Sequence, residues 1–66
     1  MISRSDDEYV DMQELAQMLG VQYATIRQQR YRGRLPKPDR VFGRSPVWRM
    51  GTLRQWAREA GKTLDE

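Results

Sequence analysis

The residues of this chain with the most chemistry to offer are the arginines, glutamines and tyrosines that lie between Gly20 and Gly33. Paired hydrogen bonds join arginine to guanine edges and phosphates, and they join glutamine to adenine edges. Few residues of this stretch are apolar, so most of its side chains are available to a ligand. We interpret the stretch, with the arginine that follows it, as a surface for duplex DNA, whose expected contact residues are Gln22, Tyr23, Thr25, Arg27, Gln28, Arg30, Tyr31, Arg32 and Arg34.

These contact residues are expected to divide into two groups. Arg27 suits a guanine edge and Gln28 an adenine edge, because both side chains form two hydrogen bonds in one plane. Arg30, Arg32 and Arg34 fall nearer the end of the stretch and suit phosphates. For any single residue of the set, a solvated side chain without a ligand remains the alternative.

A second group of possible contacts is the turn Gly43-Arg44-Ser45. A cation at the tip of a two-stranded hairpin reaches a minor groove or the phosphates beside it. We therefore add Arg44 and Ser45 to the expected DNA contacts. An ordinary exposed turn remains the alternative.

The sequence offers no grouping for catalysis or for binding a metal ion. It contains no cysteine and no histidine, which excludes disulfides, zinc-thiolate sites and a histidine-activated serine. Ser45 has no histidine partner, and the acids gather toward the chain ends instead of around a pocket. We expect a binding protein that is not an enzyme and that needs no cofactor and no metal.

Charge is distributed unevenly along the chain. Residues 21–58 contain ten Lys or Arg against a single acid, Asp39, and nine of the ten are Arg. Residues 1–20 contain five acids against one Arg. A sustained basic stretch between acidic ends indicates a polyanion as the partner, with a merely solvated basic surface as the alternative.

Two helices joined by a tight turn are expected to present the contact residues. Asp11, followed three residues later by Glu14, has the capping-box spacing that begins a helix. Gly20 is expected to end this helix, and residues 22–32 to form the next one, which ends at Gly33. The apolar stripe of the first helix recurs at helical spacing and consists of Met12, Leu15, Ala16 and Leu19.

The second half of the chain predicts a hairpin and a final helix. Residues 35–38 contain two prolines and are expected to be extended, because proline disfavours helix at the residue before it. Residues 40–42 and 46–49 are β-rich runs on either side of a glycine-containing turn, which predicts a two-stranded hairpin. The final helix is expected to begin near residues 51–52 and to end at Gly61.

A chain of 66 residues is expected to form one domain with a small core. We expect a mobile acidic segment over residues 1–10, an α+β domain that is mostly α over residues 11–61, and a polar tail over residues 62–66. Within the first segment, Tyr9 and Val10 could pack or pair as an extended lead-in. Both tryptophans are assigned to the core, with stacking on single-stranded bases as their alternative role. The expected core consists of Met12, Leu15, Ala16, Leu19, Val21, Ile26, Leu35, Val41, Trp48, Leu53, Trp56 and Ala57.

The apolar runs of the chain are short, so we expect no membrane span and no signal peptide. The lack of cysteine fits the reducing cytoplasm.

Several motifs of this chain resemble those of small MerR-like winged helix-turn-helix proteins, a family that includes phage excisionases (recombination directionality factors) and AlpA-like prophage regulators. The resemblance covers roughly residues 11–60 and departs from the family pattern at Gln22 and Gln29. The motifs that carry it are Leu15-Ala16, Leu19-Gly20-Val21, Thr25-Ile26-Arg27, Arg32-Gly33, Leu35-Pro36-Lys37-Pro38, Gly43-Arg44-Ser45, Trp48-Arg49 and Leu53-Arg54-Gln55-Trp56.

The resemblance implies a winged helix-turn-helix fold that binds double-stranded DNA without a cofactor. For an excisionase it implies that the protein binds beside an attachment site in the bacterial cytoplasm, bends the DNA and directs a phage integrase toward excision. MerR-like activators usually add a long dimerising helix, so a chain that stops at Glu66 favours the excisionase role. A short AlpA-like transcription regulator is the alternative, and an adaptor that binds an acidic protein is a third.

One such domain reads few base pairs, so several copies are expected on neighbouring sites. Opposite charges at the two ends of the domain suggest that the copies meet head to tail. We expect a monomer in solution that binds tandem sites cooperatively. The residues expected at this contact are Asp6, Asp7 and Glu8 on one copy and Arg40, Arg44 and Arg49 on its neighbour.

Overall fold

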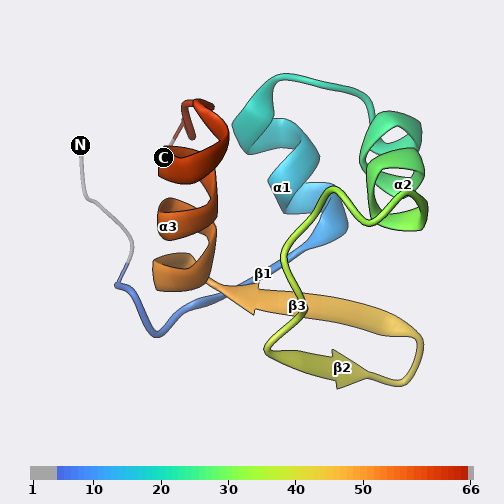
Figure 1. Ribbon diagram of the computed structural model, residues 1–66. Helices are drawn as coiled ribbons and strands as arrows, with labels where there is room; N and C mark the ends of the chain where they lie inside the picture. The colour runs from blue at the N-terminus through green and yellow to red at the C-terminus, as the bar shows by residue number, and fades with distance from the viewer. Residues whose placement is uncertain (1–4, 66) are drawn as a thin grey trace.

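Three helices and a three-stranded antiparallel sheet make up residues 5–65, the part of the chain that the computed structural model describes (Figure 1). The expected α+β class is confirmed. The elements in chain order are β1 (Tyr9–Asp11), α1 (Met12–Leu19), α2 (Tyr23–Tyr31), β2 (Arg40–Phe42), β3 (Ser45–Arg49) and α3 (Met50–Ala60).

The sheet has one strand more than the sequence predicted. Its order is β1-β3-β2, so the central strand β3 pairs with the expected hairpin partner β2 and also with β1. The register sets Tyr9 opposite Arg49 and Val10 opposite Trp48. A lone two-stranded hairpin is marginally stable, and the third strand buries Val10 and Trp48 together on one face.

The N-terminal segment differs from the mobile stretch expected over residues 1–10. Residues 1–4 lie outside the described residues, but main-chain hydrogen bonds attach the rest to the start of α3. The Met50 N–H donates to the Glu8 carbonyl at 2.9 Å and the Gly51 N–H donates to the Asp6 carbonyl at 3.1 Å. The N–H groups in the first turn of any helix have no acceptor within that helix. Arg49 provides no side-chain cap for α3, so the Glu8 and Asp6 carbonyls accept two of these hydrogen bonds.

The first helix begins and ends as predicted. The Glu14 N–H donates to Asp11 Oδ1 at 2.8 Å, which confirms Asp11 as the N-cap. Gly20 takes the left-handed conformation at φ 69°, and the Val21 N–H donates to the Ala16 carbonyl at 3.0 Å. This Schellman arrangement reverses the chain within a few residues and starts α2 close to the end of α1.

The core forms between α1, α2, α3 and the helix-facing side of the sheet. Trp48, Leu15, Ile26 and Leu53 are fully buried in it, as predicted. Ala16 and Ala57 are also buried, and Met12, Leu19, Leu35 and Trp56 pack at its margin. The residues that the sequence did not assign to the core are the buried Val10, Met18, Pro46, Val47 and Met50, and Leu64 at its margin.

Two residues assigned to the core lie at the surface, so their assignment was wrong. Val21 is 38% exposed because the left-handed turn at Gly20 carries it to the outside. Val41 is 54% exposed because β2 is an edge strand at the side of the sheet away from the helices (Figure 1).

Both tryptophans fix the segment that leads from α2 to β2. The Trp48 Nε1–H donates to the Pro36 carbonyl at 2.8 Å, and the Trp56 Nε1–H donates to the Arg34 carbonyl at 3.2 Å. A buried indole needs such a partner for its N–H group. These bonds therefore tie the connecting segment to the core and hold the β2–β3 hairpin in a defined place relative to α2.

Candidate nucleic-acid interface

The second helix turns most of its predicted contact residues outward. Ile26 is fully buried, and Thr25 and Gln29 lie half-buried beside it, so these three residues form the inward stripe. Thr25, which the sequence analysis placed among the contacts, therefore lies on the side turned to the core. Its neighbour Ala24 is exposed instead, because the burial of Ile26 determines which side of the helix faces the core.

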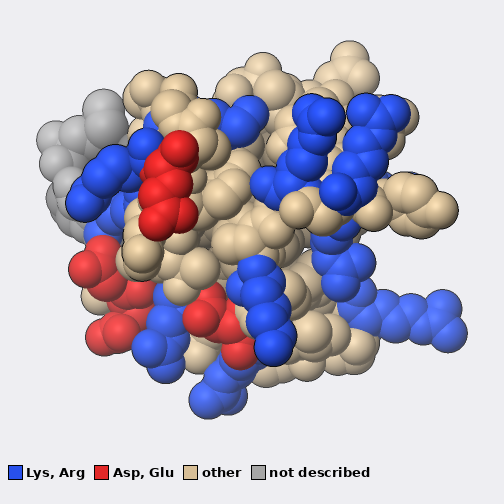
Figure 2. All heavy atoms as spheres, viewed as in Figure 1, with Lys and Arg blue, Asp and Glu red and all other residues tan. Residues whose placement is uncertain are grey.

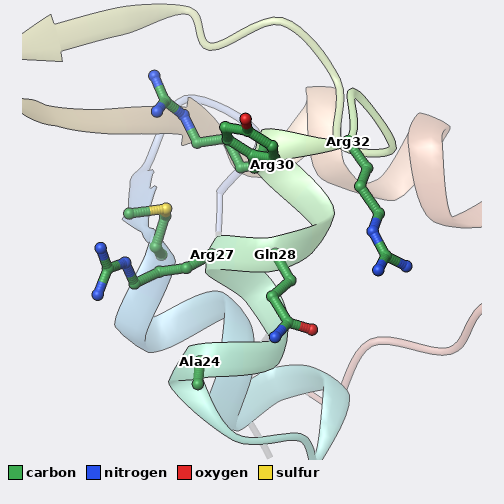
Figure 3. A pocket seen from close by; sticks show the side chains of 7 residues that line it. Ala24, Arg27, Gln28, Arg30 and Arg32 are labelled. Atoms are coloured by element: carbon green, nitrogen blue, oxygen red, sulfur yellow. The ribbon is translucent and has the colours of Figure 1, made fainter.

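The outer face of α2 presents arginine and glutamine side chains in two directions. Figure 3 shows Arg27 and Arg30 extending to one side of the helix and Gln28 and Arg32 extending to the other. They border an open hollow of about 600 Å³, which is lined by Met12, Ala24, Arg27, Gln28, Arg30, Tyr31 and Arg32. A ligand that covers this face meets cationic and amide groups at once.

Two tyrosines complete the outer face. Tyr31 is 94% exposed and Tyr23 is 45% exposed, although each carries an aromatic ring. A ring exposed to this extent contributes little to the core of its own domain. The tyrosines are therefore available to contact a partner through the ring and the phenol hydroxyl.

The ends of α2 leave its polar groups open to a ligand. Gln22 is the N-cap but makes no side-chain capping hydrogen bond, and the first turn carries no acid. At the other end, Gly33 takes a left-handed conformation at φ 72°, and the Arg34 N–H donates to the Gln29 carbonyl at 2.8 Å. Arg32 and Arg34 are exposed around this end of the helix.

The turn between β2 and β3, which contains Arg44, lies on the same side of the molecule as α2 (Figure 1). Phe42 and Ser45 are directly paired, so Gly43 and Arg44 alone form the turn, and Gly43 has the positive φ of 62° that tight hairpin turns favour. Ser45 and Tyr23 border one small hollow together with the start of α1. The turn and the beginning of α2 thus form one continuous surface.

Charge is unevenly distributed over the face of the molecule that Figure 2 shows. In Figure 2 the half that carries α2 and the hairpin turn shows only Lys and Arg among the charged residues, and the acids lie toward α3 and the N-terminal segment. Asp39, the single acid of residues 21–58, accepts a hydrogen bond at 2.9 Å from the Arg49 N–H. This carboxylate is therefore occupied by a main-chain hydrogen bond, as is that of Asp11, which borders the hollow beside Tyr23 and accepts from the Glu14 N–H.

Arg49 and Arg40 lie on the sheet and contact Tyr9. The hydrogen bond between the Arg49 and Tyr9 side chains raises the pKa of Arg49 above its ordinary value. The Cζ atom of Arg40 lies 5.8 Å from the centroid of the Tyr9 ring, within the range of a cation–π contact. Both arginines thus have partners within the sheet.

Within residues 5–65, no cluster of three or more potential metal ligands is placed to hold an ion. No helix of this part combines the length and hydropathy that crossing a bilayer requires. Comparison with protein-family models, with curated proteins and with solved structures found no match to the chain. The chemistry that the described surface offers is hydrogen bonding and charge, on an exposed helix and an adjoining turn.

Proposed function

We propose that the chain is a winged helix-turn-helix protein that binds double-stranded DNA in a sequence-specific manner. In this proposal α1 and α2 are the helix-turn-helix, the β2–β3 hairpin is the wing, and α2 enters the major groove. The observation that carries it is the outer face of α2, where exposed arginine, glutamine and tyrosine side chains border one hollow, on the same side of the molecule as the hairpin turn.

The dimensions of the molecule support this arrangement. An α-helix of nine residues is about 14 Å long, and the major groove is about 12 Å wide and admits one helix. The longest dimension of the molecule is 31 Å, slightly less than one helical turn of DNA at about 34 Å. One copy therefore reaches a major groove and the minor groove beside it.

Within this proposal the contact residues have separate roles. Arg27 binds a guanine edge and Gln28 an adenine edge, because both lie on the exposed side of α2. Arg30, Arg32 and Arg34 bind phosphates on either side of the groove, and Arg44 reaches the minor groove or its phosphates.

We further propose an architectural role of the excisionase type, in which the protein bends attachment-site DNA and directs a phage integrase toward excision. The resemblance of the sequence motifs to MerR-like excisionases supports this role. An AlpA-like transcription regulator is the second candidate, since it uses the same interface. A footprint on a phage attachment region, with and without the integrase, separates the two roles.

Cooperative binding of neighbouring copies remains a prediction, and the structure adds a condition to it. Asp6 forms an ion pair with Arg54 of the same chain, and the Asp6 carbonyl is bonded to the Gly51 N–H. A head-to-tail contact through Asp6 therefore competes with an internal contact. Binding to DNA with one, two and three sites measures whether the copies cooperate.

Selection from random duplexes, followed by gel-shift titration over a salt series, tests DNA binding. We expect enrichment of a defined site and a slope of log K against log salt of about −3.6, if four arginines contact phosphates. No enriched site and weak salt dependence would contradict the proposal, and would favour an adaptor that binds an acidic protein.

A further inference from the structure

Phe42 is an apolar residue that neither the core nor the proposed contacts account for. It is 58% exposed at the end of β2, directly before the hairpin turn. A domain this small has few large apolar residues to spare from its core. An exposed ring at the tip of a hairpin therefore calls for a physical explanation.

The position of Phe42 places it at the surface proposed for DNA. Its cross-strand partner is Ser45, and side chains of directly paired residues lie on the same face of a sheet. Ser45 in turn borders the hollow that Tyr23 of α2 lines. Phe42 is thus the residue directly before the turn that contains Arg44, on the face of the sheet opposite the core-facing Trp48.

The Phe42 ring is braced on one side and open on the other. Its centroid lies 6.3 Å from that of Tyr9, and the planes meet at 84°, which is an edge-to-face contact. Tyr9 is itself held by Arg40 over its ring and by the side-chain hydrogen bond of Arg49. The contact with Tyr9 therefore holds one edge of the Phe42 ring against the sheet, and the rest of the ring stays exposed.

We propose that Phe42 is a wedge that enters the minor groove and partly unstacks one base step, so that the duplex kinks at the hairpin. This inference rests on the proposed DNA binding. Apolar side chains that are inserted between base steps produce kinks of about 20–90° toward the major groove. Arg44, two residues further along, supplies the cation that the phosphates of a narrowed or bent groove attract.

The wedge also gives the protein a preference for certain base steps, without any hydrogen bond to the bases. Pyrimidine–purine steps unstack at the lowest cost, so the site under the hairpin is expected to contain a TA or CA step. The bend would then turn the duplex around the molecule and bring more phosphates within reach of the arginines at the end of α2. Phe42 thereby determines both the bend and part of the sequence preference.

The test compares Phe42→Ala with Phe42→Leu and with Val41→Ala on the duplex that the wild-type protein selects. Val41→Ala is the matched control, because Val41 is a similarly exposed apolar residue on the opposite face of β2. The bend is measured by energy transfer between dye-labelled ends at saturating protein, and unstacking by 2-aminopurine placed at successive steps under the hairpin.

We expect the wild-type complex to show a bend and a several-fold rise in 2-aminopurine fluorescence at one step. Phe42→Ala should lose more than half of the bend and all of the rise, and Phe42→Leu and Val41→Ala should keep both, since leucine also acts as a wedge. If Phe42→Ala melts below the assay temperature, Phe42→Thr removes the ring and keeps a residue that favours β-strands.

An unchanged bend and unchanged fluorescence in a folded Phe42 variant would overturn the wedge. An equal loss in Val41→Ala would also overturn it, because the effect would then come from the strand as a whole. A wild-type protein that binds its selected duplex without bending it would contradict the wedge and the architectural role, and would leave the proposed sequence-specific DNA binding standing. A wild-type protein that selects no duplex removes both.

Discussion

Arg27 and Arg44 are both exposed arginines, and their surroundings suit them to different contacts in the proposed DNA complex. Arg27 projects from the exposed face of a regular helix, where the backbone fixes its direction relative to a groove (Figure 3). Arg44 lies in a two-residue turn at the tip of the hairpin. A fixed side chain suits the reading of a base edge, and an exposed turn cation suits a phosphate.

Arg27→Ala is expected to weaken binding to the selected duplex by about 1–3 kcal/mol and to relax the preference at one base pair, because a bidentate contact with guanine is lost. Titrations on the selected duplex and on a randomised one measure both effects. Arg58→Ala, an exposed arginine on α3, is the control and should bind as the wild type does. An equal loss on both duplexes would make Arg27 a phosphate contact only.

Arg44→Ala is expected to lower affinity for all duplexes alike, and to reduce the salt slope by about 0.9, because one phosphate contact disappears. The variant should remain folded, since Arg44 is exposed and Gly43 provides the turn conformation. Circular dichroism checks the fold, and gel shifts at several salt concentrations give the slope. An unaltered slope with unaltered affinity would leave the hairpin tip without a role in binding.

At the scale of elements, the position of α2 depends on how α1 begins and ends. Asp11 caps α1 and is also the last residue of β1, so one side chain joins the start of the helix to the sheet. Gly20 reverses the chain so that α2 packs back against α1. A change at either end is expected to alter stability before it alters any contact with DNA.

Asp11→Ala is expected to lower the free energy of unfolding by about 0.5–2 kcal/mol, because the Glu14 N–H loses its acceptor. Urea unfolding followed by tryptophan fluorescence gives the value. Asp11→Asn keeps an acceptor at the same place and should be close to the wild type. If the asparagine variant is as unstable as the alanine variant, the charge of Asp11 matters more than its capping bond.

At the scale of the whole molecule, Trp48 lies in the core between the sheet and the helices and bonds to the connecting segment. Trp56 packs at the edge of this core. Trp48 is fully buried and bonded to Pro36, and Trp56 is half-buried and bonded to Arg34. A core of this size supplies only about 3–5 kcal/mol of stability. The loss of the central indole therefore approaches the stability of the entire domain.

Trp48→Ala is expected to unfold the protein at room temperature, because truncation of a buried aromatic residue costs about 3–5 kcal/mol. Trp56→Ala should stay folded with a lower melting temperature, since half-burial leaves less surface to lose. Circular dichroism melts of both variants test this order. The reverse order would place the centre of the core beside α3 instead of within the sheet.

The sequence by itself determined the structural features that depend on residues close together in the chain. The Asp11 cap, the stops at Gly20 and Gly61, the hairpin turn at Gly43 and the stripe of α1 all follow from local backbone preferences and helical spacing. The outward direction of Arg27 and Gln28 also followed, because Ile26 fixes the phase of α2.

Only the tertiary structure decided the features that depend on residues far apart in the chain. The pairing of Tyr9–Asp11 with β3 joins segments about 40 residues apart, and a three-residue strand has too little pattern to reveal it. The exposure of Val41 depends on where β2 lies in the sheet, and that of Val21 on the path of the turn. The bracing of Phe42 by Tyr9 joins the two edge strands, because each element buries a face only against partners that the folded chain supplies.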